Sequence, residues 1–153
     1  MQDSRHSRRW IWVAVLVQVA GLAFDVVWHG VINPGFEAVT VAEMARHLGT
    51  VHLPIYIGVV SVLLSSVWAL VADGRRSAVG IALPVACAGA VLATAGEAWH
   101  AYNHLQLSTH GGPIAAATSF LGLLVVVSAL WLERRHGRRR GAGQEVEERR
   151  RAA

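Results

Sequence analysis

The chain has 153 residues, of which 54% are apolar and only 16% are charged, a composition typical of an integral membrane protein. The formal net charge of +4 comes from the two ends: residues 1–9 carry +2 (three Arg, one Asp) and residues 133–153 carry +4 (eight Arg, four Glu). No aromatic residue interrupts the arginines of the C-terminal stretch, which argues against nucleic-acid binding. The single cysteine, Cys87, excludes a disulfide framework and a cysteine-based metal site, so any bound metal must be held by nitrogen and oxygen atoms.

Four apolar runs are long enough to cross a bilayer as helices. They follow a basic leader, residues 1–9, and precede an Arg/Glu-rich tail, residues 133–153, which we expect to be disordered from about Gly137. The predicted spans are residues 10–29, 53–72, 78–104 and 113–132. The sequence therefore predicts an all-α integral membrane protein with one domain, a four-transmembrane-helix bundle.

The first run has a second interpretation. A basic segment and an apolar run precede Gly21-Leu22-Ala23, which resembles a signal-peptide cleavage site, so residues 1–23 could be a cleaved leader. The run is long for a signal peptide, however, and cleavage would leave Asp25 and His29 on a short stub. We therefore favour a first membrane span.

The segment between the first two spans contains a short predicted helix. Thr40-Val41-Ala42-Glu43 has the form of a capping box, and Gly49 marks the end of the helix. Glu43 and His47 lie four residues apart on this helix, but a capping role explains Glu43 better than metal ligation does.

The distribution of arginines predicts the orientation of the bundle. Apart from Arg46, every arginine lies in the two ends or in the loop between the second and third spans. The positive-inside bias therefore predicts cytoplasmic termini and a multi-pass protein of the cytoplasmic (plasma) membrane, most simply a bacterial inner membrane. Tryptophans flank the same boundaries, as in an aromatic belt: Trp10, Trp12, Trp68 and Trp131 on the cytoplasmic side, and Trp28 and Trp99 on the outer side.

The third span carries the strongest functional signal. On a helix, Glu97, His100 and His104 fall within about 60° of one another on one face. The first span repeats the pattern near its end, where Asp25 and His29 lie four residues apart. The predicted topology places these five residues at one level near the outer face, and we expect them to be the ligands of a metal site. His47, His52, His110 and, less favoured, Glu43 are expected to be additional ligands or to hold the ligands in place.

The residue types narrow the metal and leave alternatives open. Neutral imidazoles with carboxylates suit copper, zinc or non-haem iron, and this set offers enough ligands for one ion or two. In a second interpretation, Asp25 and Glu97 only form hydrogen-bonded packing contacts between helices, with Gln18, Thr94 or a histidine. In a third, His29 faces His100 or His104 across a b-type haem, although haem ligation gives the two carboxylates no role.

Known catalytic motifs do not identify a reaction. The sequence has no His-Glu-x-x-His helix, no Gly-rich phosphate loop and no serine nucleophile elbow. Asp25 and His29, at the outer end of a span, resemble in their spacing the metal-binding helix of the C subunit of particulate methane and ammonia monooxygenases. This resemblance covers two residues and identifies no family.

The site predicts a membrane metalloprotein, and a metal-dependent redox enzyme is the preferred function. The alternatives are a metal-handling protein that captures or passes on copper or zinc, and a haem electron-transfer protein. Only a few serines and threonines and Gln18 lie beneath the site, which is little for a cation path through one chain. Apart from the bilayer, a second copy of the chain or a membrane partner is left open, and catalytic residues are not identified.

Overall fold

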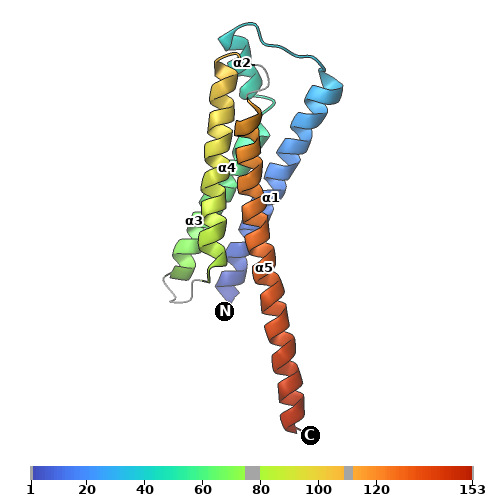
Figure 1. Ribbon diagram of the computed structural model, residues 1–153, viewed down its shortest axis with the longest axis vertical. Coiled ribbons are helices and arrows are strands. Elements are labelled where there is room, and N and C mark those ends of the chain that lie inside the picture. Colours follow the sequence, from blue (N-terminus) through green and yellow to red (C-terminus); the bar gives the residue numbers. More distant parts are fainter. Residues whose placement is uncertain (1, 75–79, 109–111, 153) are drawn as a thin grey trace.

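The computed structural model describes residues 2–74, 80–108 and 112–152, with side chains over residues 7–74, 80–108 and 112–137 and at Arg151. Its elements, in chain order, are α1 (Gln2–Val27), the π-helix η1 (Trp28–Ile32), α2 (Val41–Leu48), α3 (Leu53–Gly74), α4 (Ala82–Leu105) and α5 (Pro113–Ala152) (Figure 1). No strand occurs in the described residues. Four helical stretches are long and apolar enough to span a membrane: Ser7–Ile32, Leu53–Gly74, Ala82–Leu105 and Pro113–Gly137. The predicted all-α, four-helix membrane bundle is confirmed.

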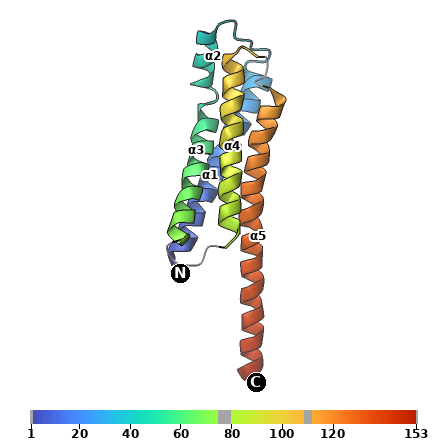
Figure 2. The same ribbon diagram turned by 60° about the vertical axis from the view of Figure 1, so that its left-hand side comes forward.

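The four long helices pack in two pairs. α1 runs along α3, α4 runs along α5, and α3 joins the pairs by contacting α4. Figures 1 and 2 show the start of α1 and the far end of α5 at one end of the bundle, whereas α2 covers the opposite end, which we call the α2 end. α1 is inclined to the other helices, so that its last turns lie away from α4 and α5 (Figure 1).

Apolar side chains cover the outside of the bundle. Large residues on every span are exposed, including Leu16 on α1 (65%), Leu64 on α3 (63%), Val91 on α4 (54%) and Phe120 on α5 (55%). A soluble bundle would present polar residues at these positions, whereas a lipid-facing bundle presents apolar ones. The surface therefore fits a bilayer environment.

Small residues allow α4 and α5 to approach closely. A Cβ atom added to Gly96 would collide with the backbone of Ser119, and one added to Gly122 would collide with the backbone of Ala93. Such contacts between small residues are the usual way in which membrane helices associate. They fix the height of α4 against α5 at the level of Glu97.

The end opposite α2 is closed by packing and by ions. The core there contains Ile11, Val62, Leu83 and Val126, each fully buried. At its edge, the Arg8 guanidinium donates two hydrogen bonds of 2.8 Å to Glu133 and lies 3.1 Å from Asp73. This ionic contact ties α1, α3 and α5 together.

The local predictions for α2 agree with the structure. The Glu43 backbone N–H donates to the Thr40 hydroxyl at 3.2 Å, and the Glu43 carboxylate accepts from the Val39 N–H at 3.0 Å. α2 ends at Leu48, with Gly49 as its C-cap. Glu43 is thus a capping residue, as the sequence favoured.

Two features differ from the predictions. The first span ends in a π-helical turn, in which the Asn33 N–H donates to the Trp28 carbonyl at 2.8 Å. The stretch beyond Gly137, which we expected to be disordered, continues α5 as a helix to Ala152. The physical reason is that Arg, Glu and Ala favour the helix, and the membrane span has already nucleated it.

Candidate metal centre

A cluster of ionisable side chains fills the α2 end of the bundle. Its members come from every element that meets there: Asp25 from α1, His29 from η1, His47 from α2, His52 from the turn before α3, and Glu97, His100 and His104 from α4. The structure therefore brings together all five residues that the sequence predicted as principal ligands, and adds His47 and His52 to them.

The upper part of the cluster is a group of three histidines, His29, His47 and His52. Each offers a ring nitrogen, and these three atoms lie within 4.8 Å of one another. The ring centroids of His29 and His47 are 5.1 Å apart, and those of His47 and His52 are 5.0 Å apart. Metal–nitrogen bonds of about 2.0–2.1 Å place ligand atoms roughly 3–4 Å apart, so small side-chain rotations suffice to hold an ion.

The lower part is a mixed group of His52, Glu97 and His100. Its three ligand atoms also lie within 4.8 Å of one another, and the His52 and His100 ring centroids are 5.9 Å apart. Glu97 is only 5% exposed, and its Oε1 atom has no hydrogen-bond partner within the described part of the chain. A carboxylate in this position supplies the negative charge that a cation needs.

His52 belongs to both groups. The residue is 1% exposed, and neither of its ring nitrogens has a hydrogen-bond partner among the described residues. Burial, followed by the neighbouring imidazoles of His104, His47, His100 and His29, lowers the pKa of His52 from 6.5 to about 3. The ring is therefore neutral at pH 7, which is the form that binds a metal.

Asp25 and His104 lie at the edges of the two groups. The Asp25 Oδ1 atom is 3.5 Å from Nε2 of His29 and 3.4 Å from Nε2 of His52. Nε2 of His104 is 3.2 Å from Nε2 of His100. Both residues are thus within reach of an ion held by their neighbours, although neither belongs to a three-residue group.

Aromatic residues hold His47 in position. Its ring lies 4.7 Å from Trp28 and 4.5 Å from Phe36, measured between centroids. α2 buries one face, with Met44, His47 and Leu48, against the bundle. Burial, with a smaller effect of His29, lowers the pKa of His47 and keeps this ring neutral as well.

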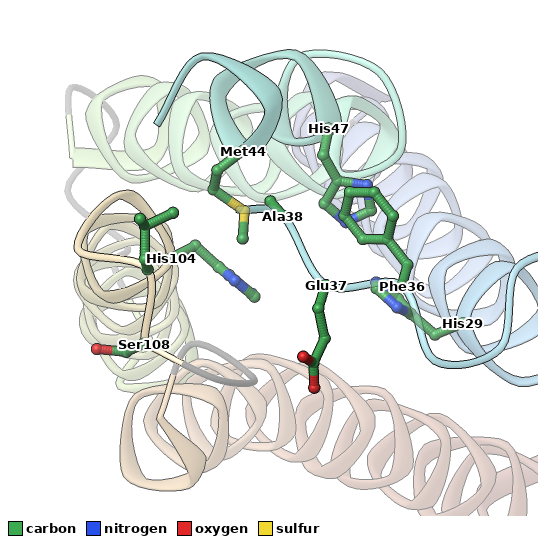
Figure 3. A pocket seen from close by; sticks show the side chains of 9 residues that line it. His29, Phe36, Glu37, Ala38, Met44, His47, His104 and Ser108 are labelled. Carbon is green, nitrogen blue, oxygen red and sulfur yellow. The ribbon is translucent and has the colours of Figure 1, made fainter. Parts of the chain in front are cut away.

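Two cavities adjoin the cluster. One, of about 100 Å³, opens at the α2 end, and Figure 3 shows the side chains of Glu37, Met44 and His104 projecting into it. The other, of about 150 Å³, lies on the membrane side of the cluster and has Asp25, Glu97 and His100 in its wall. Cavities of this size favour a bare ion with a small ligand over a macrocycle.

The predicted additional residues have different outcomes. His47 and His52, expected in secondary roles, are members of the three-residue groups, whereas Glu43 bonds to the backbone at the start of α2 and is in neither group. His110 lies outside the described residues. Sequence reasoning gave no part in the site to Glu37 or Met44, because a lone loop carboxylate and a lone helical methionine carry no spacing signal.

The sequence matches no protein-family model, no curated protein and no solved structure. The functional argument therefore depends on the geometry of the site. The described histidines and carboxylates are close enough together to hold a metal ion.

Proposed function

We propose that this chain is a membrane metalloprotein that binds a transition metal at the α2 end. The observation that carries the proposal is the pair of three-residue groups that share His52. Buried ring nitrogens and carboxylate oxygens in these groups could bind a metal and have no hydrogen-bond partner in the described chain. A buried polar atom without a partner costs about 1–3 kcal/mol, so a set of them in a membrane protein points to a ligand that satisfies them. The nitrogen and carboxylate donors suit copper, zinc or non-haem iron.

The proposed orientation places the metal site near the outer face of the plasma membrane. The arginines of the chain support it, because Arg8 and Arg134 lie toward the end opposite the site, together with the basic tail. By the positive-inside bias, that end is cytoplasmic, as expected for a bacterial inner membrane.

Within this site, a metal-dependent redox enzyme is the function that fits best. A transporter would need a continuous series of polar groups below the site, yet the core of the opposite half is mainly apolar. The buried Ser66 hydroxyl adds one polar group there, whereas Ser65 and Thr94 donate to their own helix backbone at 2.7 and 2.8 Å. The shared histidine and the two carboxylates can instead hold one or two ions, while Asp25 and Glu97 accept or release protons beside them.

A metal-handling function is the second candidate, and the cavity in Figure 3 favours it. Glu37 is exposed, and its side chain projects into the cavity together with those of Met44 and His104, so carboxylate, thioether and imidazole groups line a path into a cavity that His29 and His47 also border. Such a path suits capture of a cation from outside. A resident catalytic ion would exchange slowly with a chelator, whereas a captured ion would exchange rapidly.

The direct test is elemental analysis of the detergent-purified protein, prepared without a histidine tag or chelator. We expect copper, zinc or iron at about one or two ions per chain. The Asp25→Asn and Glu97→Gln variants should retain less metal, because each loses an anionic donor beside the histidines. Background metal in the wild type after reconstitution, or unchanged content in both variants, would reject the proposal. Copper or iron would favour redox chemistry, and zinc a Lewis-acid role.

A further inference from the structure

The cavity of about 150 Å³ on the membrane side of the cluster has an unusual wall. Its apolar lining residues include Leu22, Ile55 and Phe120, from three different helices, and the buried Ser119 also borders it. Asp25, Glu97 and His100 form part of the wall toward the metal-binding groups. A molecule inside this cavity would therefore contact both hydrocarbon side chains and the candidate metal ligands.

Gln18 adds a polar group in the membrane interior. Its side chain lines the cavity, is 1% exposed, and has an Oε1 atom with no hydrogen-bond partner among the described residues. The backbone of α1 at Gln18 lies against Gly58 of α3, where a Cβ atom would collide with it, so this level of α1 is fixed. A buried amide oxygen without a donor is costly, and a bound molecule with a hydroxyl group would satisfy it.

The cavity is placed for entry from the lipid. Phe120, in its wall, is 55% exposed on the outside of the bundle. Leu22 of α1 and Phe120 of α5 both belong to this wall, and α1 and α5 make few contacts with each other. The last turns of α1 lie away from α5 (Figure 1). A molecule that partitions into the bilayer can therefore reach the cavity without passing the cluster.

We propose that this cavity binds a short-chain alcohol, whose hydroxyl donates to Oε1 of Gln18 and whose hydrocarbon chain lies against Leu22 and Phe120. A cavity of this volume holds a molecule about the size of benzene, roughly six carbon atoms. Gln18 precedes Asp25 by two helical turns, about 10 Å along α1, so such a molecule spans the distance from the amide to the cluster. As a substrate site, the cavity depends on the proposed metalloprotein function; as a binding site, it does not.

The test is photolabelling of the full-length protein in liposomes with azibutanol, a short-chain alcohol that carries a photoreactive diazirine. Labelled residues are mapped by mass spectrometry, with and without excess unlabelled hexanol, and the metal content of the same samples is measured. We expect labelling at Leu22 or Phe120 that hexanol competes away. Gln18→Leu should weaken this labelling about tenfold, the effect of one lost hydrogen bond of about 1.4 kcal/mol.

A matched pair of variants tests the cavity with Gln18 intact. Ala116 and its neighbour Ala117 are both exposed, but only Ala116 belongs to the lining of the cavity. Ala116→Leu should abolish the competed labelling, and Ala117→Leu should leave it unchanged.

Labelling that hexanol does not reduce, or that both variants affect equally, would overturn the proposal by indicating general labelling from lipid. Competed labelling in a metal-free protein would support the binding site and reject the metal function, whereas bound metal without competed labelling would reject the cavity alone.

Discussion

Replacing His52 with leucine separates the stability of the fold from the function of the site. The two ring nitrogens are buried without a hydrogen bond in the described chain, Nε2 having only the 3.4 Å contact with Asp25 Oδ1, and each such group costs about 1–3 kcal/mol. Leucine has a similar volume and no polar atom, so repacking offsets only part of the gain. We expect His52→Leu to stabilise the metal-free protein by about 1–3 kcal/mol. The same change removes a ligand from both three-residue groups.

The assay compares wild type and variant after metal is stripped and again after reconstitution. Unfolding in detergent measures the stability of the metal-free forms, and elemental analysis measures bound metal. Wild type should gain stability on reconstitution, whereas His52→Leu should not, and its metal content should fall to background. His136→Leu is the control, because it removes a histidine at the opposite end of the bundle, where the ring contacts the Leu132 carbonyl.

Single replacements in one group each refine this result. His47→Ala removes a ligand from the upper group only, and Glu97→Gln removes one from the lower group only. If two ions bind, each of these variants should keep one. A His52→Leu variant that retains full metal content, or a metal-free His52→Leu protein less stable than wild type, would refute the central role of His52.

Three further predictions concern acid, helix contact and the ionic contact of the opposite end. Folding lowers the pKa of His52 from 6.5 to about 3, so between these pH values the unfolded chain binds a proton at His52 that the folded metal-free protein does not bind. The free energy of unfolding, measured against pH, should therefore fall from pH 6.5 towards pH 3 by at most roughly 5 kcal/mol. His52→Leu should make this pH dependence weaker. Gly96→Ala should push α4 away from α5 and reduce both thermal stability and metal content. Gly137→Ala has open space around it in the exposed part of α5, so it should stabilise the helix by about 0.5–1 kcal/mol and leave the metal content unchanged. Arg8→Gln removes the cation that lies 3.1 Å from the buried Asp73 carboxylate. The free energy of unfolding in detergent should fall by about 1–3 kcal/mol, and the metal content should not change. An unchanged unfolding midpoint would show that solvent already screens this ion pair.

The membrane spans could be predicted from the sequence because the bilayer requires a minimum length of consecutive apolar residues, which can be counted along the chain. A helix must bury about 20 apolar residues, and Pro54 and Pro113 mark first turns, so the spans beginning at Leu53 and Pro113 start where expected. The capping box at Thr40 is also local, since its hydrogen bonds join residues three and four apart. Neither prediction requires knowledge of which helices are neighbours.

The importance of His52 could not be predicted in the same way. Sequence spacing identifies ligands that share a helix face, such as Glu97 and His100, but His52 is one residue before α3 and has no such partner along the chain. Its position becomes central only because α1, α2 and α4 converge around the start of α3. The position of Gln18 in the cavity wall also depends on tertiary structure. From the sequence alone, a single glutamine in a membrane span indicates only a packing contact.

The π-helical turn at the end of α1 shows how local structure serves the cluster. A π-helical turn is wider than an α-helical one, so it changes the direction of the residues that follow. π-turns occur often at functional sites, where surrounding contacts stabilise them although the local sequence does not favour them. Here the contacts are the Trp28 ring against His29 and His47, at 4.8 and 4.7 Å. The turn thus places His29 beside His47, and the aromatic contacts maintain the turn.

The two halves of the bundle differ in how many of their buried polar atoms have hydrogen-bond partners, and this difference supports the proposed position of the metal site. The half near Arg8 has a tightly packed apolar core, and its buried Asp73 carboxylate lies beside a cation, although Asp73 Oδ1 and the buried Ser66 hydroxyl have no hydrogen-bond partner in the described chain. The α2 end instead collects a larger set of buried nitrogen and oxygen atoms without hydrogen-bond partners in the described chain, on Asp25, His47, His52 and Glu97, next to two cavities. Natural proteins retain such local instability where a ligand or a reaction requires it. His52→Leu should therefore remove from the metal-free protein part of the cost that a bound metal would offset in the wild type.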